Sequence, residues 1–238
     1  MNLARGGPPS LFRLEVKAAL AGVRAIGLRV GVTLLLGLPF VLVAVPLRIG
    51  AAGMAMLVTF TALFGAVVGG VRRREDGRRE HLRLLPLPRW LVAADTILAG
   101  ATVDMVQIAP LMVAFAASRA APASWATVVG LAGALAASLL LLNALGLAVA
   151  SRVRTNAEAH LYGALAVAGA ALFSGLVPTP EHLQGLVAVT ARWSPLHHLA
   201  AMLQAVAGED PGVTIWPMGA TLVVFLVTCA ARARCPAR

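Results

Sequence analysis

Residues 51–71 read AAGMAMLVTFTALFGAVVGGV, and residues 72–90, which follow directly, read RRREDGRREHLRLLPLPRW. The first stretch has no charged side chain, whereas the second is densely charged. A helix crosses the roughly 30 Å of membrane hydrocarbon with about 20 mostly apolar residues, which residues 51–71 supply. The two stretches therefore predict a membrane-spanning helix that ends in a charged segment at the membrane surface.

The composition of the whole chain agrees with this prediction. The 238 residues are 59% hydrophobic and 13% charged, and the mean hydropathy is +0.84. So few polar residues could not cover a water-soluble core of this size. The two cysteines, Cys229 and Cys235, provide no disulfide framework, and the N-terminal segment lacks the apolar core of a cleavable signal peptide. We therefore expect an integral membrane protein.

Six stretches are long and apolar enough to cross the membrane as helices. We predict an all-α, polytopic membrane protein that forms a single transmembrane domain over residues 1–238. The predicted spans are residues 28–47, 52–71, 91–117, 125–150, 159–177 and 213–231.

Two other segments are predicted to be helical without crossing. Residues 10–26 carry Arg13, Lys17 and Arg24 on one helical stripe and apolar side chains on another, which is typical of a helix lying in the membrane interface. The alternative is that this segment is an ordinary solvated stretch that precedes the first span. Residues 178–208 contain Thr-Pro and Ser-Pro steps at Thr179 and Ser194 that favour two helix starts.

Each helix within residues 178–208 would hold about 12 residues, or roughly 18 Å, which is too short to cross. We therefore predict two short re-entrant helices at the outer face, the second of which ends at Gly208. A single poor span over residues 182–206 is the alternative, but Pro195 and Arg192 disfavour it.

The net charge of +10 follows from membrane sidedness. With both termini in the cytoplasm, most of the 20 basic residues lie on the cytoplasmic side, and Arg48, Arg119 and Arg192 remain outside. The basic residues can also contact anionic lipid heads. The chain lacks aromatic platforms and a soluble basic face, so we expect no nucleic-acid partner.

The chain carries no recognisable catalytic or nucleotide-binding motif. It has neither the G-x-x-x-x-G-K-[ST] phosphate loop, nor H-E-x-x-H, nor G-x-S-x-G. His182, His197 and His198 gather in the outer segment, where hydrogen-bonded or solvated histidines are commoner than metal ligands. We expect no catalytic residue, metal or cofactor in this chain.

Asp104 is the most informative polar residue, because it falls near the middle of the third predicted span. Gln107 lies one turn further on the same helix face, and Asn143 of the fourth span is a candidate neighbour. An acid at this depth is costly and marks a functional site by default. Two interpretations stay open: Asp104 lines a substrate path, or it makes an interhelical hydrogen bond that fixes the packing.

The charged segment at residues 72–90 contains a predicted short helix, from about residue 78 to residue 85. Leu82, Leu84 and Leu85 give it an apolar side, and Arg78, Arg79, Glu80 and Arg83 give it a charged one. This pattern suits docking into a groove on a cytoplasmic partner. A connector that lies on the lipid surface is the alternative.

These residues resemble the membrane subunit of a type-2 ABC exporter. The first cytoplasmic loop of that family has the form E-x-G-T-x-E-x-L-x-x-x-P-x-x-R. The corresponding residues here are Glu75, Gly77, Glu80, Leu82, Pro86 and Arg89, with Arg78 in place of the small hydroxyl residue. The stretches FSGLVPTPEHLQGL and WSPLHHLAAMLQAVAG are similar to the family's re-entrant region after the fifth span.

The resemblance implies a partner ATP-binding subunit that holds ATP and Mg²⁺, and a second permease subunit, identical or related. It implies that the coupling contact uses Glu75, Gly77, Glu80, Leu82, Leu85 and Pro86. It also implies an exporter in a bacterial inner membrane. An apolar path with one carboxylate favours a hydrophobic or amphiphilic compound, such as a drug or antibiotic, and Asp104, Gln107 and Asn143 are the candidate residues of that path.

Two other classes of membrane protein remain as alternatives. The first is an ATP-independent polytopic protein, such as an intramembrane enzyme or an assembly factor, that uses Asp104. The second is a channel or secondary transporter, a class that often shows inverted repeats with matching broken helices. This chain is predicted to break only once, after the fifth span, which disfavours the second class.

Overall fold

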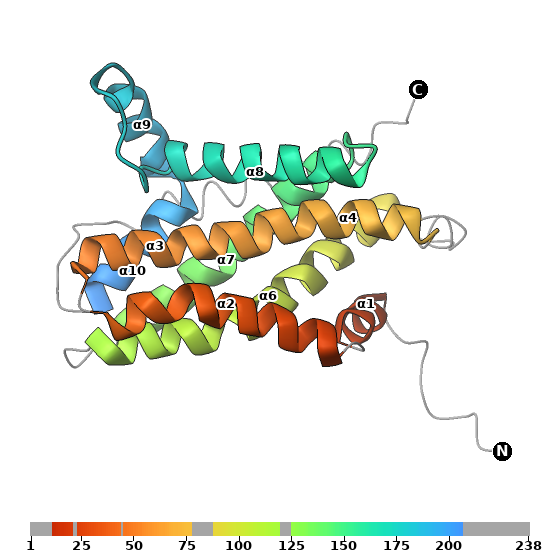
Figure 1. Ribbon diagram of the computed structural model, residues 1–238, viewed down its shortest axis with the longest axis horizontal. Coiled ribbons are helices and arrows are strands. Elements are labelled where there is room, and N and C mark those ends of the chain that lie inside the picture. The colour runs from red at the N-terminus through yellow and green to blue at the C-terminus, as the bar shows by residue number, and fades with distance from the viewer. Residues whose placement is uncertain (1–10, 21–22, 44, 78–87, 120–124, 207–238) are drawn as a thin grey trace.

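The structure is a computed structural model, and it describes residues 11–20, 23–43, 45–77, 88–119 and 125–206. Within these ranges the secondary structure is helical throughout, without a strand (Figure 1). The predicted all-α fold class is therefore confirmed. The helices in these ranges are α1 (Leu11–Leu20), α2 (Val23–Leu42), α3 (Leu47–Thr59), η1 (Phe60–Phe64), α4 (Gly65–Glu75), α6 (Arg89–Arg119), α7 (Trp125–Ala150), α8 (Asn156–Phe173), α9 (Glu181–Trp193) and α10 (Pro195–Val206).

Three of these helices are long and apolar enough to cross a membrane. They are the continuous helix Leu47–Glu75, made of α3, η1 and α4, then Trp90–Arg119 within α6, and Trp125–Ala150, which is α7. The α2 helix contains a shorter apolar stretch, Val30–Leu42. The sixth predicted span, residues 213–231, lies outside the described residues, so a total of six crossings stays a prediction.

Some helix ends differ from the limits that apolar composition predicts. The α7 helix covers residues 125–150, the range predicted for the fourth span. The α2 helix instead begins at Val23 and ends at Leu42, before the predicted end at residue 47. Proline restricts the residue before it to an extended backbone, so Pro46 separates α2 from α3 and stands at the N-cap of α3.

The first helix lies at one end of the bundle and packs mainly against α6 (Figure 1). It ends at Leu20, so the predicted segment 10–26 divides between α1 and the start of α2. Arg13 and Lys17 are exposed on α1, as its amphipathic pattern predicts, whereas Glu15 is buried.

The α9 and α10 helices stand at the opposite end of the bundle from α1 (Figure 1). They have 13 and 12 residues and are separated at Ser194. The α9 helix contacts α8, and α10 packs between α3 and α7. The N-cap of α9 is Pro180 and has no side-chain cap, so the expected capping role of Thr179 is wrong, because the helix begins one residue later.

Ser194 Oγ instead lies 2.6 Å from Ser174 Oγ, just beyond the end of α8. The hydroxyl of Thr190 also donates to the Phe173 carbonyl oxygen at 2.9 Å. These contacts fix the turn between the two short helices against α8. Gly208, the predicted end of the second helix, lies outside the described residues.

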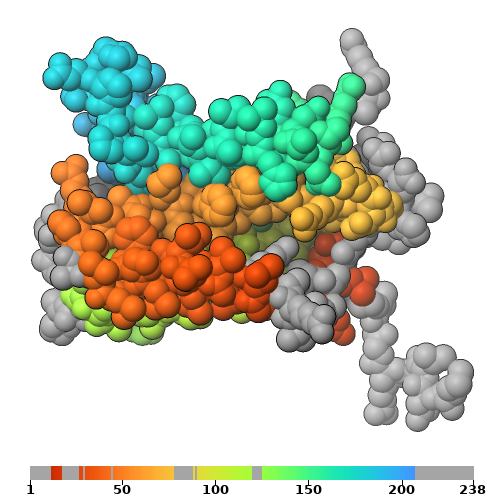
Figure 2. Space-filling view, in the orientation of Figure 1, coloured from red at the N-terminus to blue at the C-terminus, as the bar shows by residue number. Residues whose placement is uncertain are grey.

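The buried core lies where α3, η1, α6, α7 and α10 meet, around Met54, Leu63, Phe115, Leu139 and Leu199. The α8 helix packs on η1 and α4 (Figure 2). Between α2, η1, α4, α6 and α7, the packing leaves a cavity.

Candidate functional site

Asp104 and Asn143 meet between α6 and α7. The amide nitrogen Nδ2 of Asn143 donates to Asp104 Oδ2 at 2.7 Å and to the Leu139 carbonyl oxygen at 3.0 Å. Asn143 is buried, and Asp104 is partly exposed. A methyl group at Gly100 would overlap the Asn143 amide, so the absence of a side chain at Gly100 lets Asn143 approach α6. The predicted neighbour of Asp104 is therefore in contact with it.

Gln107 lies one turn beyond Asp104 on α6 but contacts a different helix. Its Nε2 donates to Thr33 Oγ1 of α2 at 2.5 Å, and both side chains are buried. The two polar contacts therefore connect the middle of α6 to α7 on one side and to α2 on the other.

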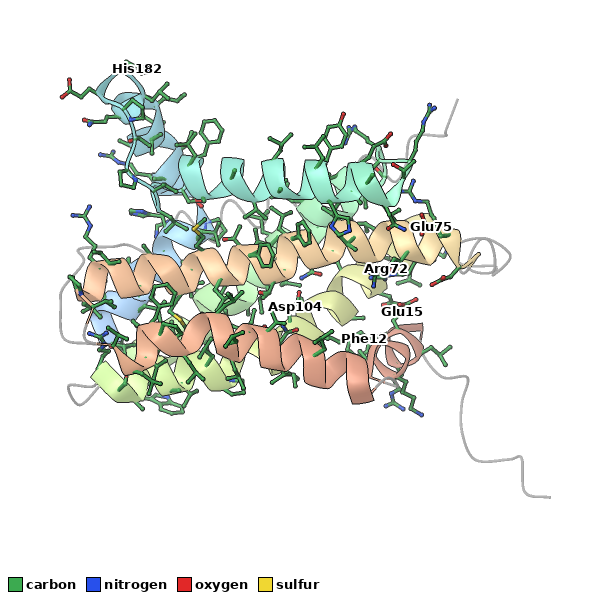
Figure 3. The ribbon with its side chains drawn as sticks, viewed as in Figure 1. Phe12, Glu15, Arg72, Glu75, Asp104 and His182 are labelled. Atoms are coloured by element: carbon green, nitrogen blue, oxygen red, sulfur yellow. The ribbon has the colours of Figure 1, made fainter. Side chains whose placement is uncertain are left out.

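All three predicted path residues line one cavity of about 500 Å³. Its walls come from α2, η1, α4, α6 and α7, and Figure 3 shows Asp104 about midway along the bundle. The surface between α2 and α4 is recessed in Figure 2, with α6 visible behind it. Beside its polar lining, the cavity has small and apolar residues on its walls, including Gly65, Ala66, Gly69, Ala99, Gly100 and Val103.

Charged side chains line the end of this cavity nearest α1. Glu15 of α1 is 5% exposed and forms an ion pair with Arg73 of α4, with 3.5 Å between Oε2 and Nη1. Arg72 and Asp76 also line this end of the cavity. Figure 3 shows Glu15 and Arg72 near one another at the end of the bundle, away from Asp104.

The sequence analysis missed the role of Glu15, although a signal was present. At 100° per residue, Glu15 falls beside Phe12 and Val16, on the apolar side of α1. A carboxylate on the buried face of an interfacial helix needs a partner inside the protein, because burying an isolated charge is costly. The identity of that partner, Arg73, could not be read from the local pattern.

The cavity wall also contains a π-helical turn, η1, which the sequence analysis did not predict. The rings of Phe60 and Phe64 are stacked with centroids 5.0 Å apart, and Phe64 contacts the His160 ring at 5.5 Å. The hydroxyl of Thr61 donates to the Leu57 carbonyl oxygen at 2.9 Å. Single π turns inside α-helices occur frequently at functional sites.

Two of the predicted coupling residues lie just beyond the charged end of this cavity. Glu75 is the last residue of α4, and its Oε2 accepts from Asn156 Nδ2 of α8 at 2.5 Å. Gly77 has a φ of 66°, a left-handed conformation that glycine adopts without strain, and it follows directly on the end of α4. The other predicted coupling residues, Glu80, Leu82, Leu85 and Pro86, lie outside the described residues.

The histidines of the outer segment do not form one cluster, because His182 lies apart from His197 and His198. His182 lies on α9, far from the cavity (Figure 3), and His197 and His198 are on α10. The Nε2 of His198 lies 2.9 Å from the Arg192 carbonyl oxygen, and burial lowers the pKa of His198. Within the described ranges, no group of three or more His, Cys, Asp or Glu side chains could hold a metal ion.

The membrane-crossing helices packed around a partly polar cavity define the class: a polytopic, all-helical membrane protein. The sequence profile of the ABC-2 type transporter family matches residues 13–207, and the chain belongs to this family. This confirms the family prediction and makes the chain a membrane component of a transport system. Among curated proteins and solved structures, the searches found no match.

Proposed function

We propose that this chain is the permease subunit of an ATP-driven exporter. A separate subunit binds ATP and Mg²⁺, and this chain supplies the path for a hydrophobic or amphiphilic compound. A second permease subunit, identical or related, completes the transporter. The segment from Glu75 to Pro86 receives the motion of the ATP-binding subunit in the cytoplasm of a bacterial cell.

The observation that carries this proposal is the continuity of the helix Leu47–Glu75. This one helix carries Phe60 and Phe64 of the cavity wall and ends at Glu75, where the predicted coupling segment begins. Force applied to the segment therefore acts on the cavity wall directly.

The contacts of α4 explain how such a force would spread. Arg74 donates to the Ala150 carbonyl oxygen at the end of α7, and Glu75 accepts from Asn156 at the start of α8. Both contacts lie at the end of the bundle nearest the coupling segment. We infer that α4, α7 and α8 move together when the ATP-binding subunits close, as a rigid-body shift of packed helices.

The test reverses charge or polarity in the predicted coupling helix. Glu80→Lys and Leu82→Arg should abolish substrate-stimulated ATP hydrolysis by the purified complex and leave membrane insertion of the chain intact. Arg152→Glu is the matched control, because Arg152 is an exposed charge at the same end of the bundle but outside this segment. Full activity of both coupling variants would contradict the proposal.

The alternative, an ATP-independent membrane enzyme or assembly factor that uses Asp104, predicts a different result. Its activity would persist in cells that lack the ATP-binding subunit, and co-purification with such a subunit would fail. Under the export proposal, transport into inverted vesicles requires both the subunit and ATP.

A further inference from the structure

The cavity described above is built within a single chain. Thr33 of α2, Phe64 of η1, Asp104 of α6 and Asn143 of α7 all line it. Its volume of about 500 Å³ lies within the roughly 300–1,000 Å³ of small-molecule sites. Four helical elements of one chain therefore offer side chains to a ligand of this size.

Midway along the bundle, the wall of the cavity has a carboxylate in a fixed orientation. Asn143 holds Asp104 Oδ2 at 2.7 Å, and the Asp104 side chain is partly exposed where it lines the cavity. An ionisable side chain at mid-span marks a ligand path by default, since its burial is otherwise costly. A cationic group is the complement of this carboxylate.

The apolar wall faces the same space. The stacked Phe60 and Phe64 rings line it together with Leu28, Val32 and Val68. Phe60 is 41% exposed, so its ring has surface available for contact. Aromatic faces attract organic cations as well as apolar groups. The wall therefore suits the hydrocarbon or aromatic body of a ligand whose charge lies at Asp104.

Among the described residues, the charged side chains that line the end of the cavity nearest α1 balance, since Arg72 and Arg73 are positive and Glu15 and Asp76 are negative. Asp104 lies away from these four residues, about midway along the bundle (Figure 3).

We propose that each chain binds an amphiphilic organic cation in this cavity, with the cationic group at Asp104 and the apolar body against Phe60 and Phe64. The biological role of this site rests on the proposed export function. Binding itself requires only this chain, so it can be measured without the ATP-binding subunit.

The test uses the purified full-length chain in detergent and a fluorescent probe, monodansylcadaverine, which joins a primary ammonium group to an aromatic body. Its N-acetylated form has nearly the same body and no charge. We expect saturable binding of the cation with one probe per chain. Asp104→Asn should weaken binding of the cation at least about tenfold and leave the weaker binding of the acetylated probe unchanged.

A second variant fills the cavity. Gly65 lines it, and a Cβ at Gly65 would have no neighbour within 4 Å, so Gly65→Phe should enter the open space and block both probes. Gly133→Phe is the matched control, because Gly133 of α7 also has open space around its Cβ position but does not line the cavity. Every variant is first checked for an unchanged thermal unfolding midpoint.

Equal effects of Gly65→Phe and Gly133→Phe, or an unchanged affinity for the cation in Asp104→Asn, would overturn the proposal. One probe per two chains would also overturn it, because the site would then lie between subunits. Leu82→Arg should bind the probe normally although it loses substrate-stimulated ATP hydrolysis. The binding assay therefore tests this site, and the ATP hydrolysis assay tests the export mechanism separately.

Discussion

Asn143 donates from one amide nitrogen to two acceptors, Asp104 Oδ2 and the Leu139 carbonyl oxygen. The second bond is within α7 and holds the side chain in place, so the first bond fixes the Asp104 carboxylate relative to α7. Gly100 provides the space in which the amide lies. Polar contacts between membrane helices contribute to their association.

We predict that Asn143→Ala lowers the free energy of unfolding by about 1–3 kcal/mol, because the partly buried Asp104 carboxylate loses its donor. The loss should be smaller when Asp104 has already been changed to alanine, since the two residues then no longer interact. Unfolding of the four variants of this cycle in mixed detergent micelles measures both values. Equal losses in the two backgrounds would show that the contact contributes nothing.

The sequence predicted part of this residue-level arrangement. Asp104 and Asn143 both fall near mid-span, and polar side chains at one depth tend to meet inside a helix bundle, so their contact was foreseeable. Thr33 was not distinguishable from other threonines, because its hydroxyl could equally bond within its own helix. Arg73 lies 58 residues from Glu15 in sequence, and only the folded chain brings them together.

At the scale of helices, α7 packs closely against the junction of η1 and α4. A Cβ at Gly146 would lie 2.5 Å from the Ala66 Cβ and 2.9 Å from the Leu63 carbonyl oxygen. The second of these neighbours is backbone, which cannot rotate away. Small residues allow such close packing between membrane helices. Gly146 therefore sets the distance between two walls of the cavity.

We predict that Gly146→Ala destabilises the protein by about 1–3 kcal/mol, because the added methyl group forces α7 away from η1. Gly133→Ala is the control on the same helix, and its Cβ would meet nothing within 4 Å. Alanine favours helices over glycine by up to about 1 kcal/mol, so this control should be neutral or slightly stabilising. Thermal unfolding in detergent measures both variants, and equal midpoints would contradict the predicted contact.

Helix positions were more predictable than helix ends or internal irregularities. Apolar length alone located α7 at residues 125–150. It placed the end of the first span too late, because apolarity continues through residues 43–45 while Pro46 prevents the helix from doing so. The π turn at Phe60–Phe64 has no local signature in composition, since it depends on how the helix packs against α7 and α8.

At the scale of the whole molecule, the described basic residues are distributed unevenly between the two ends of the bundle. The end with α1 carries Arg13, Lys17, Arg72, Arg73, Arg74, Arg152 and Arg154. The end with α9 and α10 carries Arg48, Arg119 and Arg192. Arg119 has a structural role. Its guanidinium donates hydrogen bonds to the carbonyl oxygens of Phe40, Val43 and Val45, at and just beyond the end of α2.

The positive-inside rule assigns the α1 end to the cytoplasm, and this orientation places the charged end of the cavity where an ATP-binding subunit can reach it. We predict that a membrane-impermeant maleimide labels Glu181→Cys, at the start of α9, in intact cells. Ser151→Cys, at the end of α7, should be labelled only after the membrane is opened. Both positions are exposed, so reagent access within the protein does not distinguish them.

The native Cys229 and Cys235 would react as well, so both are first replaced by serine and the background labelling is measured. The reverse pattern, with Ser151→Cys labelled in intact cells, would place the coupling segment outside the cell. No cytoplasmic ATP-binding subunit could then contact Glu75–Pro86. Labelling therefore tests the proposed coupling independently of whether the cavity binds a cation, because ligand binding in detergent has no sidedness.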